Sequence, residues 1–283
     1  MTITLGELLS EARATLGRKG IESAALDAEL LCCRAKGCSR AELWAHPEEV
    51  AGPDVVNQCR AMVKRRAARE PLAYILGCKE FWSLEFRVTP AVFIPRPETE
   101  TLVEAVLEHL PGDVEGTLLE VGTGSGCVAV AIATERRGLK VVTTDKSLPA
   151  LSVARENVLR HGVGDRVLCV SCDVAQAIST GKPVLGVVSN PPYVPQPLYE
   201  QITEDVRYEP PEALEGGPSG LEFVNKLIGE AVAVLPVGAF IALELGPEQV
   251  AEVGTVLADG PWDHIESFED LRGVPRVVIA DRT

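Results

Sequence analysis

The sequence has 283 residues, of which 46% are hydrophobic and 24% are charged, a composition that suits a globular protein of one large or two modest domains. The formal net charge of −14 is uneven, because residues 1–80 carry 12 lysines and arginines against 11 acidic residues, which leaves 15 against 30 for residues 81–283. The acidic part is a poor candidate for binding a nucleic-acid backbone, since that needs basic side chains to displace counterions.

The sequence predicts neither a membrane span nor a secretion signal. No apolar run approaches the roughly 20 residues that cross a bilayer, and the opening MTITLGELLSEA lacks the basic and apolar regions of a signal peptide. Cys169 and Cys172 form a C-x-x-C, but on a predicted strand those positions face opposite sides. We therefore expect reduced cysteines, no metal site, no membrane partner and a cytoplasmic protein.

Residues 1–79 are predicted to form a small helical domain. Thr4 and Glu7 have the spacing of a capping box ahead of an apolar helical face. Further helices are predicted over residues 24–35, from Ser39, and over residues 53–69. The last of these carries Arg60, Lys64, Arg65, Arg66 and Arg69. Those side chains predict either a solvated basic face or a surface for a partner.

Residues 80–96 are predicted to be a β-hairpin linker, because EFWSLEFRVTPAVFIPR alternates like a strand pair and has no strong helix signal before Pro97. Residues 97–283 then alternate helix and strand. The predicted strands are 117–121, 140–144, 166–170, 184–189, 239–245, 264–268 and 276–280, and the predicted helices are 99–110, 127–135, 148–160 and 220–234. This pattern predicts an α/β fold with a mostly parallel sheet that binds ligands beyond the carboxyl ends of its strands.

A glycine-rich turn, VGTGSGC, follows the first strand of this sheet and leads into a helix. Its glycines allow positive φ and let a ligand approach the main chain closely. Asp145 ends the second strand, where it is placed to accept hydrogen bonds from ribose hydroxyls. Asp173 follows the third strand and either accepts from an adenine amino group or caps a helix. These positions predict a site for a nucleotide-type cofactor.

Alternating glycines preceded by Glu120, with Cys127 where a dinucleotide fingerprint has its third glycine, resemble the adenosylmethionine loop of class I methyltransferases. The fourth strand is followed by Asn190-Pro-Pro-Tyr193, in which the prolines end strand pairing and hold the asparagine on a stiff backbone. A plain proline-rich turn is the alternative interpretation. These four residues resemble the box of enzymes that methylate planar nitrogens, namely adenine N6, cytosine N4 or a glutamine amide.

A planar nitrogen is a weak nucleophile because it shares its lone pair with a π-system. The side-chain oxygen of Asn190 and the carbonyl of Pro191 are able to accept one N–H each from the target NH₂, which directs its lone pair at the methyl group. Tyr193 would pack on the flat substrate group. This chemistry is common to all three substrates.

Longer stretches resemble one family among these enzymes. Residues 69–100, REPLAYILGCKEFWSLEFRVTPAVFIPRPETE, and residues 205–221, DVRYEPPEALEGGPSGL, closely resemble the HemK/PrmC family, which methylates the glutamine of the Gly-Gly-Gln loop in class I peptide chain release factors. The resemblance covers essentially the whole chain. Glu120 stands where many relatives have aspartate.

The resemblance implies a Rossmann-like class I methyltransferase fold, with a seven-stranded sheet over residues 97–283 and a substrate-recognition domain over residues 1–79. It implies S-adenosyl-L-methionine as cofactor, S-adenosyl-L-homocysteine as product, and glutamine N5-methylation of release factors by a monomer. The implied cofactor-binding residues are Glu120, Gly122, Thr123, Gly124, Ser125, Gly126, Asp145, Asp173, Val174 and Asn190, and the implied catalytic residues are Asn190, Pro191, Pro192 and Tyr193. Two alternatives are a nucleic-acid adenine or cytosine methyltransferase, which the acidic residues 81–283 disfavour, and a non-catalytic cofactor-binding protein.

Overall fold

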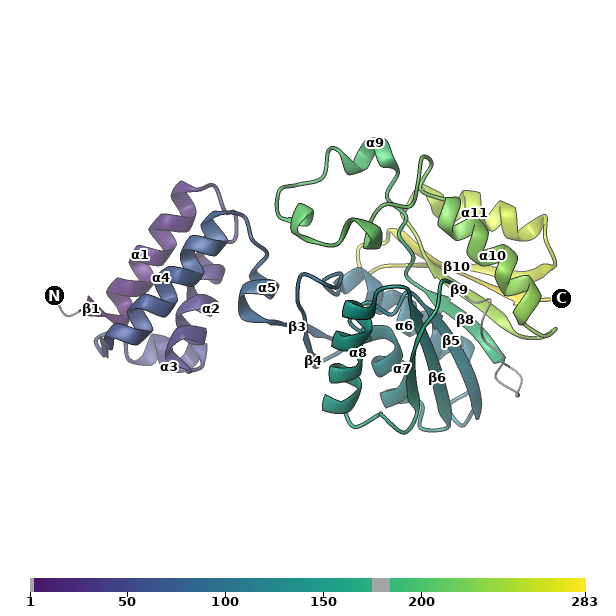
Figure 1. Cartoon of the computed structure of the whole chain (residues 1–283), viewed down its shortest axis with the longest axis horizontal. Coiled ribbons are helices and arrows are strands. Elements are labelled where there is room, and N and C mark those ends of the chain that lie inside the picture. The colour runs from purple at the N-terminus through teal and green to yellow at the C-terminus, as the bar shows by residue number, and fades with distance from the viewer. Residues whose placement is uncertain (1–2, 175–183) are drawn as a thin grey trace. The chain divides into compact units, whose positions relative to one another are not determined.

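The computed structural model describes residues 3–174 and 184–283 (Figure 1). The chain divides into two compact units. The helical unit consists of Met1–Gly77 with Glu204–Tyr208, and the sheet unit consists of Cys78–Thr203 with Glu209–Thr283. The short segment Glu204–Tyr208 therefore belongs to the helical unit although it lies far along the sequence, which the sequence analysis did not predict.

The helical unit contains the four predicted helices, a short helix α5 that was not predicted, and a pair of two-residue strands. Its helices are α1 (Leu5–Arg18), α2 (Ala24–Lys36), α3 (Arg40–Ala45), α4 (Pro53–Ala67) and α5 (Leu72–Leu76), and two-residue strands β1 (Ile3–Thr4) and β2 (Val50–Ala51) pair with each other. The capping box of Thr4 and Glu7 forms at the start of α1, and Ser39 with Glu42 forms another at the start of α3. Leucines, alanines and the thiols Cys32 and Cys59 fill the core between the helices.

The basic side chains of α4, and that of Arg69 just beyond its end, are mostly engaged within the helical unit. Arg66 is buried, and it donates to Asp27 Oδ2 and Asp205 Oδ2 at 2.7 Å each. Arg60 pairs with Glu11, Arg65 with Glu70, and Arg69 with Glu204. The predicted basic face is thus largely neutralised by carboxylates of the same unit.

The hairpin at the start of the sheet unit is shorter than the predicted linker. Strands β3 (Cys78–Phe81) and β4 (Leu84–Arg87) pair antiparallel, and Trp82 and Ser83 between them have φ of 54° and 56°, as a type I′ turn requires. Residues 88–96 are not a strand, so the prediction of strand pairing through residue 96 was wrong. Pro90 and Pro95 lack the N–H that a sheet ladder needs.

The sheet unit is built on a seven-stranded sheet in the order β10-β11-β9-β8-β5-β6-β7. The strands are β5 (Gly116–Val121), β6 (Leu139–Asp145), β7 (Val167–Ser171), β8 (Val184–Ser189), β9 (Phe240–Glu244), β10 (Trp262–Glu269) and β11 (Pro275–Arg282). Neighbours are parallel except that β11 runs antiparallel to both β9 and β10. The predicted mostly parallel α/β sheet is confirmed.

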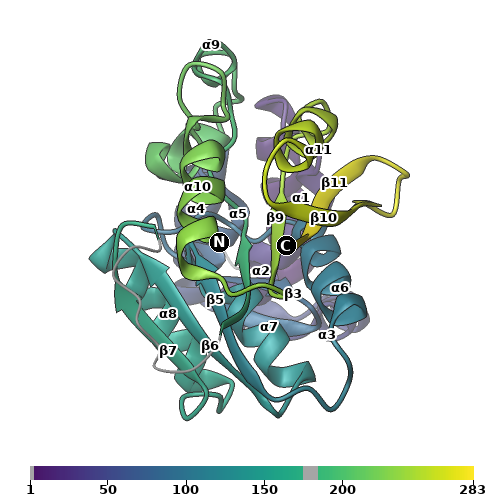
Figure 2. The ribbon, with the colours of Figure 1, turned by 90° about the vertical axis from the view of Figure 1, so that its right-hand side faces the viewer.

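Helices cover both faces of this sheet. They are α6 (Glu100–His109), α7 (Cys127–Glu135), α8 (Leu148–Arg160), α10 (Glu222–Val234) and α11 (Gln249–Ala258), whereas the short helix α9 (Gln196–Tyr199) lies on the loop after β8, away from the sheet. Leu118 and Val188 pack into a core with α6, α7 and α8, whereas Leu119 and Val187 pack with α10 and α11 on the other face (Figure 2). Because adjacent strand residues face opposite sides, both faces need apolar side chains, which gives the continuous apolar runs of the sequence. Among the described helices, none is long and apolar enough to cross a membrane.

Candidate active site

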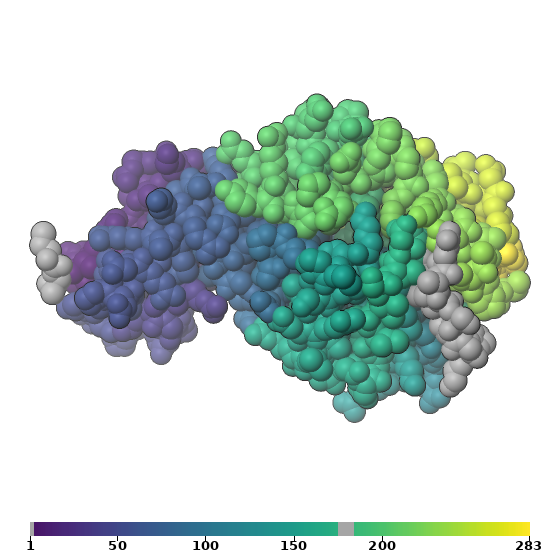
Figure 3. Space-filling view, viewed as in Figure 1, coloured from purple at the N-terminus to yellow at the C-terminus, as the bar shows by residue number. Residues whose placement is uncertain are grey.

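A pocket lies at the carboxyl ends of the parallel strands of the sheet unit. In the space-filling view, the teal segment that carries α8 and the green segment after β8 border a recess (Figure 3). The pocket is lined by every residue of the predicted site except Gly126, namely Glu120, Gly122, Thr123, Gly124, Ser125, Asp145, Asp173, Val174, Asn190, Pro191, Pro192 and Tyr193. The topology therefore brings the glycine loop and the Asn190–Tyr193 box to one cavity.

The glycine loop after β5 has the backbone that its sequence predicts. Gly122, Gly124 and Gly126 all have positive φ, and the N–H groups of Gly122 and Thr123 donate to the carbonyl of Thr144 at 2.8 and 2.9 Å. Gly126 does not line the pocket, because it supports the turn from behind. A Cβ there would lie 3.2 Å from the Cβ of Ala154 on α8.

Glu120 is a buried carboxyl beneath this loop. Its Oε2 accepts from the hydroxyls of Thr123, at 3.2 Å, and of Thr143, and its Oε1 accepts from the N–H of Ala129 at 3.2 Å. Burial raises the pKa of Glu120 to about 7, and these hydrogen bonds oppose the rise. Glu120 thus joins β5, β6 and α7, and it holds the loop in place from below.

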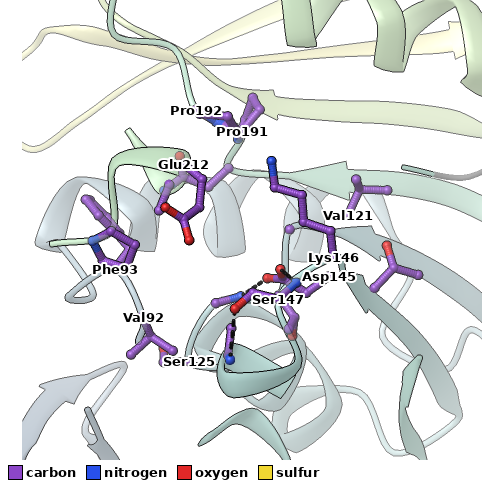
Figure 4. Close-up of a pocket in the computed structure, with 18 of the residues that line it drawn as sticks. Val92, Phe93, Val121, Ser125, Asp145, Lys146, Ser147, Pro191, Pro192 and Glu212 are labelled. Carbon is purple, nitrogen blue, oxygen red and sulfur yellow. Dashed lines mark hydrogen bonds between the residues drawn. The ribbon is translucent and has the colours of Figure 1, made fainter. Parts of the chain in front are cut away.

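Asp145 faces the pocket from the end of β6 (Figure 4). Its Oδ2 accepts from the N–H of Gly124 at 3.1 Å, and its Oδ1 accepts from the N–H of Ser147 at 2.8 Å. Burial raises the pKa of Asp145, against the lowering by these two backbone donors. Because a carboxylate oxygen has more than one lone pair, both oxygens keep the capacity to accept from a diol in the pocket.

The residues after β7 also reach the pocket. β7 ends at Ser171, so Cys172 lies beyond the strand and lines the cavity, and the prediction that it lies on the strand was wrong. Asp173 forms an ion pair with Lys226 of α10 at 2.9 Å. The alternative prediction was that Asp173 caps a helix. Such a helix would fall in residues 175–183, which lie outside the described residues, so this alternative stays a prediction. Val174 is buried, and its carbonyl accepts from the hydroxyl of Thr144 at 3.3 Å.

Asn190 follows β8 and turns its amide toward a threonine from another element. Its Nδ2 donates to Oγ1 of Thr99 at 3.1 Å, so the engaged end of the amide is the nitrogen. The Oδ1 atom is the remaining acceptor of this side chain, and Asn190 lines the pocket. Pro191 and Pro192 lie on the opposite side of the pocket from Ser125 (Figure 4).

A glycine-rich loop holds the backbone of the Asn190–Tyr193 box. The N–H of Val194 donates to the carbonyl of Leu214, and the N–H of Gly216 donates to the carbonyl of Val194, both at 2.9 Å. Gly220 has a φ of +84°, and a Cβ there would lie 2.4 Å from the carbonyl oxygen of Tyr193. Only glycine allows so close an approach, so the loop fixes where the box presents its carbonyl groups.

The segment before α6 forms another wall of the pocket, with Phe93 and Val92 on one side in Figure 4. Glu209 is buried and holds this segment, since its carboxylate accepts from the N–H of Ile94 at 3.0 Å and pairs with Arg96. The guanidinium of Arg96 lies 4.9 Å from the ring centroid of Phe93. Phe93 is therefore fixed by a charge network that the sequence did not reveal.

Two further polar residues near Asn190 escaped the sequence analysis. Thr99 belongs to the IPRPETE stretch, and Glu244 ends β9, the strand that pairs in parallel with β8. The sequence feature that could have identified Glu244 is its position, as a carboxylate at the carboxyl end of an apolar strand. None of the four histidines lines the pocket in the described part of the chain.

Comparison with known proteins supports one family over most of the chain. The family model for the PrmC N-terminal domain matches residues 7–77, and the model for the methyltransferase small domain matches residues 83–218. A solved structure of ribosomal protein L11 methylase from Lactobacillus delbrueckii subsp. bulgaricus is similar with a TM-score of 0.51 at 17% identity, over 70% of this chain and 85% of that chain. At this identity the likeness shows a shared fold and no more.

Sequence relatives carry the comparison further. The chain is 40% identical to a release factor glutamine methyltransferase of Coxiella burnetii over 91% of each chain. It is 37% identical to a release factor glutamine methyltransferase of Geobacter sulfurreducens over 97% of this chain and 95% of the relative. This chain therefore belongs to the release factor glutamine methyltransferase family.

Proposed function

We propose that this protein transfers the methyl group of S-adenosyl-L-methionine to the side-chain nitrogen N5 of the glutamine in the Gly-Gly-Gln loop of class I release factors. One observation carries the proposal, namely that the Asn190 amide has its nitrogen on Thr99 and shares one pocket with the glycine loop and Asp145. Family membership supports the substrate class. We further propose a cytoplasmic monomer whose residues 1–79 recognise the release factor.

The pocket fits the cofactor in its chemistry. A loop with three positive-φ glycines lets a ligand approach the main chain, and Asp145 offers carboxylate oxygens to ribose hydroxyls. When bound, adenosylmethionine supplies an electrophilic methyl group on a cationic sulfur. Glu120, Gly122, Thr123, Gly124, Ser125, Asp173 and Val174 would form the rest of its surroundings, with Gly126 supporting the loop.

The Asn190–Tyr193 box would prepare the substrate nitrogen. Asn190 Oδ1 and the Pro191 carbonyl would each accept one N–H of the glutamine amide, which turns the nitrogen lone pair toward the sulfonium methyl. As the sulfur–methyl bond breaks and the nitrogen–methyl bond forms, the nitrogen would become tetrahedral and positive, so these hydrogen bonds would stabilise the transition state more than the bound substrate. Adenosylhomocysteine would be the leaving group, and the nitrogen would then lose its excess proton to water. Tyr193 would pack on the amide plane, and its phenol stays protonated because burial raises its pKa.

The test is a competition between substrates. The protein is incubated with adenosylmethionine, a purified class I release factor and double-stranded DNA, and methylated products are identified by mass spectrometry. We expect one methyl group on the glutamine of Gly-Gly-Gln and none on DNA. A release factor with alanine in place of that glutamine is the control and should stay unmodified. Methyl groups on DNA bases, or none on the glutamine, would contradict the proposal.

A further inference from the structure

Thr99 and Glu244 form a second row of polar groups behind Asn190. Both side chains belong to residues that are 2% exposed. Ser189 of β8 pairs with Leu243 of β9, so the parallel register places Glu244 beside Asn190, one residue further along each strand. The Asn190 Nδ2 to Thr99 Oγ1 distance is 3.1 Å. Thr99 and Asn190 line one pocket, and the strand register places Glu244 next to Asn190, outside that lining.

Glu244 is able to accept more hydrogen bonds than the described residues around it donate. Burial raises its pKa to about 7, and hydrogen bonding with Thr99 and Tyr193 opposes the rise. Its Oε2 atom is buried and lacks a hydrogen-bond partner among the described residues. The other charged groups facing it are Arg276 of β11, which lowers its pKa, and Glu98 of the turn before α6, which raises it. A buried carboxyl with a spare acceptor is costly, which is a reason to look for its role.

The direction of the Asn190 amide depends on what Thr99 is able to offer. A hydroxyl group donates one hydrogen bond and accepts others, whereas a carboxylate only accepts. A hydrogen bond from the Thr99 hydroxyl to the Glu244 carboxylate would leave Thr99 Oγ1 as an acceptor, and the Asn190 nitrogen, 3.1 Å from that oxygen, is the end of the amide that satisfies it. Without that carboxylate, the hydroxyl would also be able to donate to Oδ1, and the amide would present its NH₂ group to the pocket. An NH₂ group there would repel the N–H bonds of a substrate amide.

We propose that Thr99 and Glu244 are positioning residues that fix the direction of the Asn190 amide, so that its oxygen faces the substrate nitrogen. The inference rests on the proposed function. Glu244 acts through Thr99 and does not touch the reacting atoms. Its ionised form is the better acceptor, so the orientation is best held above the pH at which it titrates, and methyl transfer should slow as the pH falls below that point.

The experiment compares two threonine variants in two backgrounds. Single-turnover methyl transfer to a purified release factor is measured for Thr99→Val, which removes the hydroxyl, and for Thr99→Ser, which keeps it. We expect Thr99→Val to be about tenfold slower, which is the loss of one orienting hydrogen bond, and Thr99→Ser to be within about threefold of the unmodified protein. Thr101→Val is the matched control, since Thr101 is buried on α6 outside the pocket lining, and it should leave the rate unchanged.

The second background is Asn190→Asp, whose carboxylate presents an oxygen whichever way it turns. If Thr99 acts by orienting the amide, adding Thr99→Val to Asn190→Asp should change the rate by less than about twofold. An equal tenfold loss in both backgrounds would show that Thr99 supports the fold and would overturn the inference. Full activity of Thr99→Val with Asn190 intact would overturn it as well.

Glu244→Gln supplies an independent readout. A glutamine cannot ionise, so its rate should lose the fall at acidic pH that the unmodified protein shows, while the KM for release factor stays within about twofold. An unchanged pH profile would remove Glu244 from the orienting role. Asn190→Ala separates the two proposals. Wild-type activity of Asn190→Ala would contradict the proposed function. A loss of activity in Asn190→Ala together with full activity of Thr99→Val would contradict only this inference.

Discussion

Arg66 in the helical unit and Glu244 in the sheet unit are both buried and ionisable, but their surroundings differ. Arg66 has two carboxylates within 2.7 Å. Among the residues that the structure describes, none donates to Glu244 Oε2, and burial raises the pKa of Glu244 to about 7 although hydrogen bonds oppose the rise. The helical unit thus uses its buried charge for structure, whereas the sheet unit holds two buried acids with raised pKa values, Glu120 in the pocket lining and Glu244 next to it, as functional sites often do.

The largest expected effect breaks the buried charge network of the helical unit. Arg66→Ala leaves Asp27 buried without its partner, so we expect a loss of about 3–5 kcal/mol in the free energy of unfolding of that unit. Hydrogen exchange followed by mass spectrometry should show faster exchange in α2 and α4, with β5 and β9 unchanged. Arg60→Ala, which removes only an exposed pair, is the control. Unchanged exchange in α2 would contradict the structural role of Arg66.

Asn190→Ala changes a pocket residue of the sheet unit, so its effect should fall on catalysis. Removing one of the two acceptors that orient the substrate nitrogen should lower kcat by about 10²–10³, with a smaller change in release-factor affinity. Asn190→Asp should keep more activity than Asn190→Ala, since a carboxylate still accepts the N–H bond. Single-turnover kinetics measures both, and cofactor affinity is determined separately by calorimetry. A wild-type rate for Asn190→Ala would mean that the box is only a turn.

Asp145→Ala should weaken adenosylmethionine binding by about 1.5–3 kcal/mol, the range for charge-assisted hydrogen bonds. The structure adds a second cause, because Asp145 also holds the N–H groups of Gly124 and Ser147. Asp145→Asn keeps one acceptor oxygen, so it should lose less affinity than Asp145→Ala. Calorimetric titration of both variants checks the order. Equal affinity of Asp145→Ala and the unmodified protein would remove Asp145 from the cofactor site.

The buried acids of the sheet unit also predict how stability depends on pH. Glu120 and Glu244 have pKa values of about 7 in the folded protein and an ordinary value of 4.5. Between these values the folded state binds more protons than the unfolded state, so stability falls as the pH rises. We expect a loss of about 1–3 kcal/mol per group between pH 5 and 8.

Urea unfolding at a series of pH values measures this loss, with fluorescence of the buried Trp262 as the probe of the sheet unit. Glu244→Gln cannot ionise, so its stability should change less over the same range. Parallel curves for the variant and the unmodified protein would contradict the raised pKa of Glu244.

Much of the fold was predictable because its signals are local. The strand at residues 184–189 and the helices at 127–135 and 148–160 have the predicted bounds, since apolar runs and glycine or proline boundaries define them in sequence. The predicted hairpin failed beyond Arg87, where alternation continues without pairing. Residues 204–208 gave no signal for joining the helical unit, because their partners, such as Arg66, lie far away in sequence.

The candidate site was also predictable only where its signals are local in sequence. The glycine loop and the Asn190 box were predictable, because each is a short motif at the end of one strand. Thr99 and Glu244 were not, since their role depends on the register between β8 and β9 and on a contact that spans 91 residues. Burial decides whether a carboxyl group keeps its ordinary pKa or has a raised one. A single sequence does not show whether one particular polar residue is buried.

The smallest expected effect concerns the exposed basic residues of α4. Arg60 forms an exposed pair with Glu11, so this charge already has a partner within the helical unit, and such solvent-screened pairs contribute little. We expect Arg60→Ala combined with Lys64→Ala to change methylation of an intact release factor by less than about twofold at low and at physiological salt. A short Gly-Gly-Gln peptide is the control substrate, since it lacks the remainder of the release factor. A loss that appears only with the intact release factor and only at low salt would show that α4 docks the partner, and the helical unit would then use exposed charge for recognition as well as buried charge for structure.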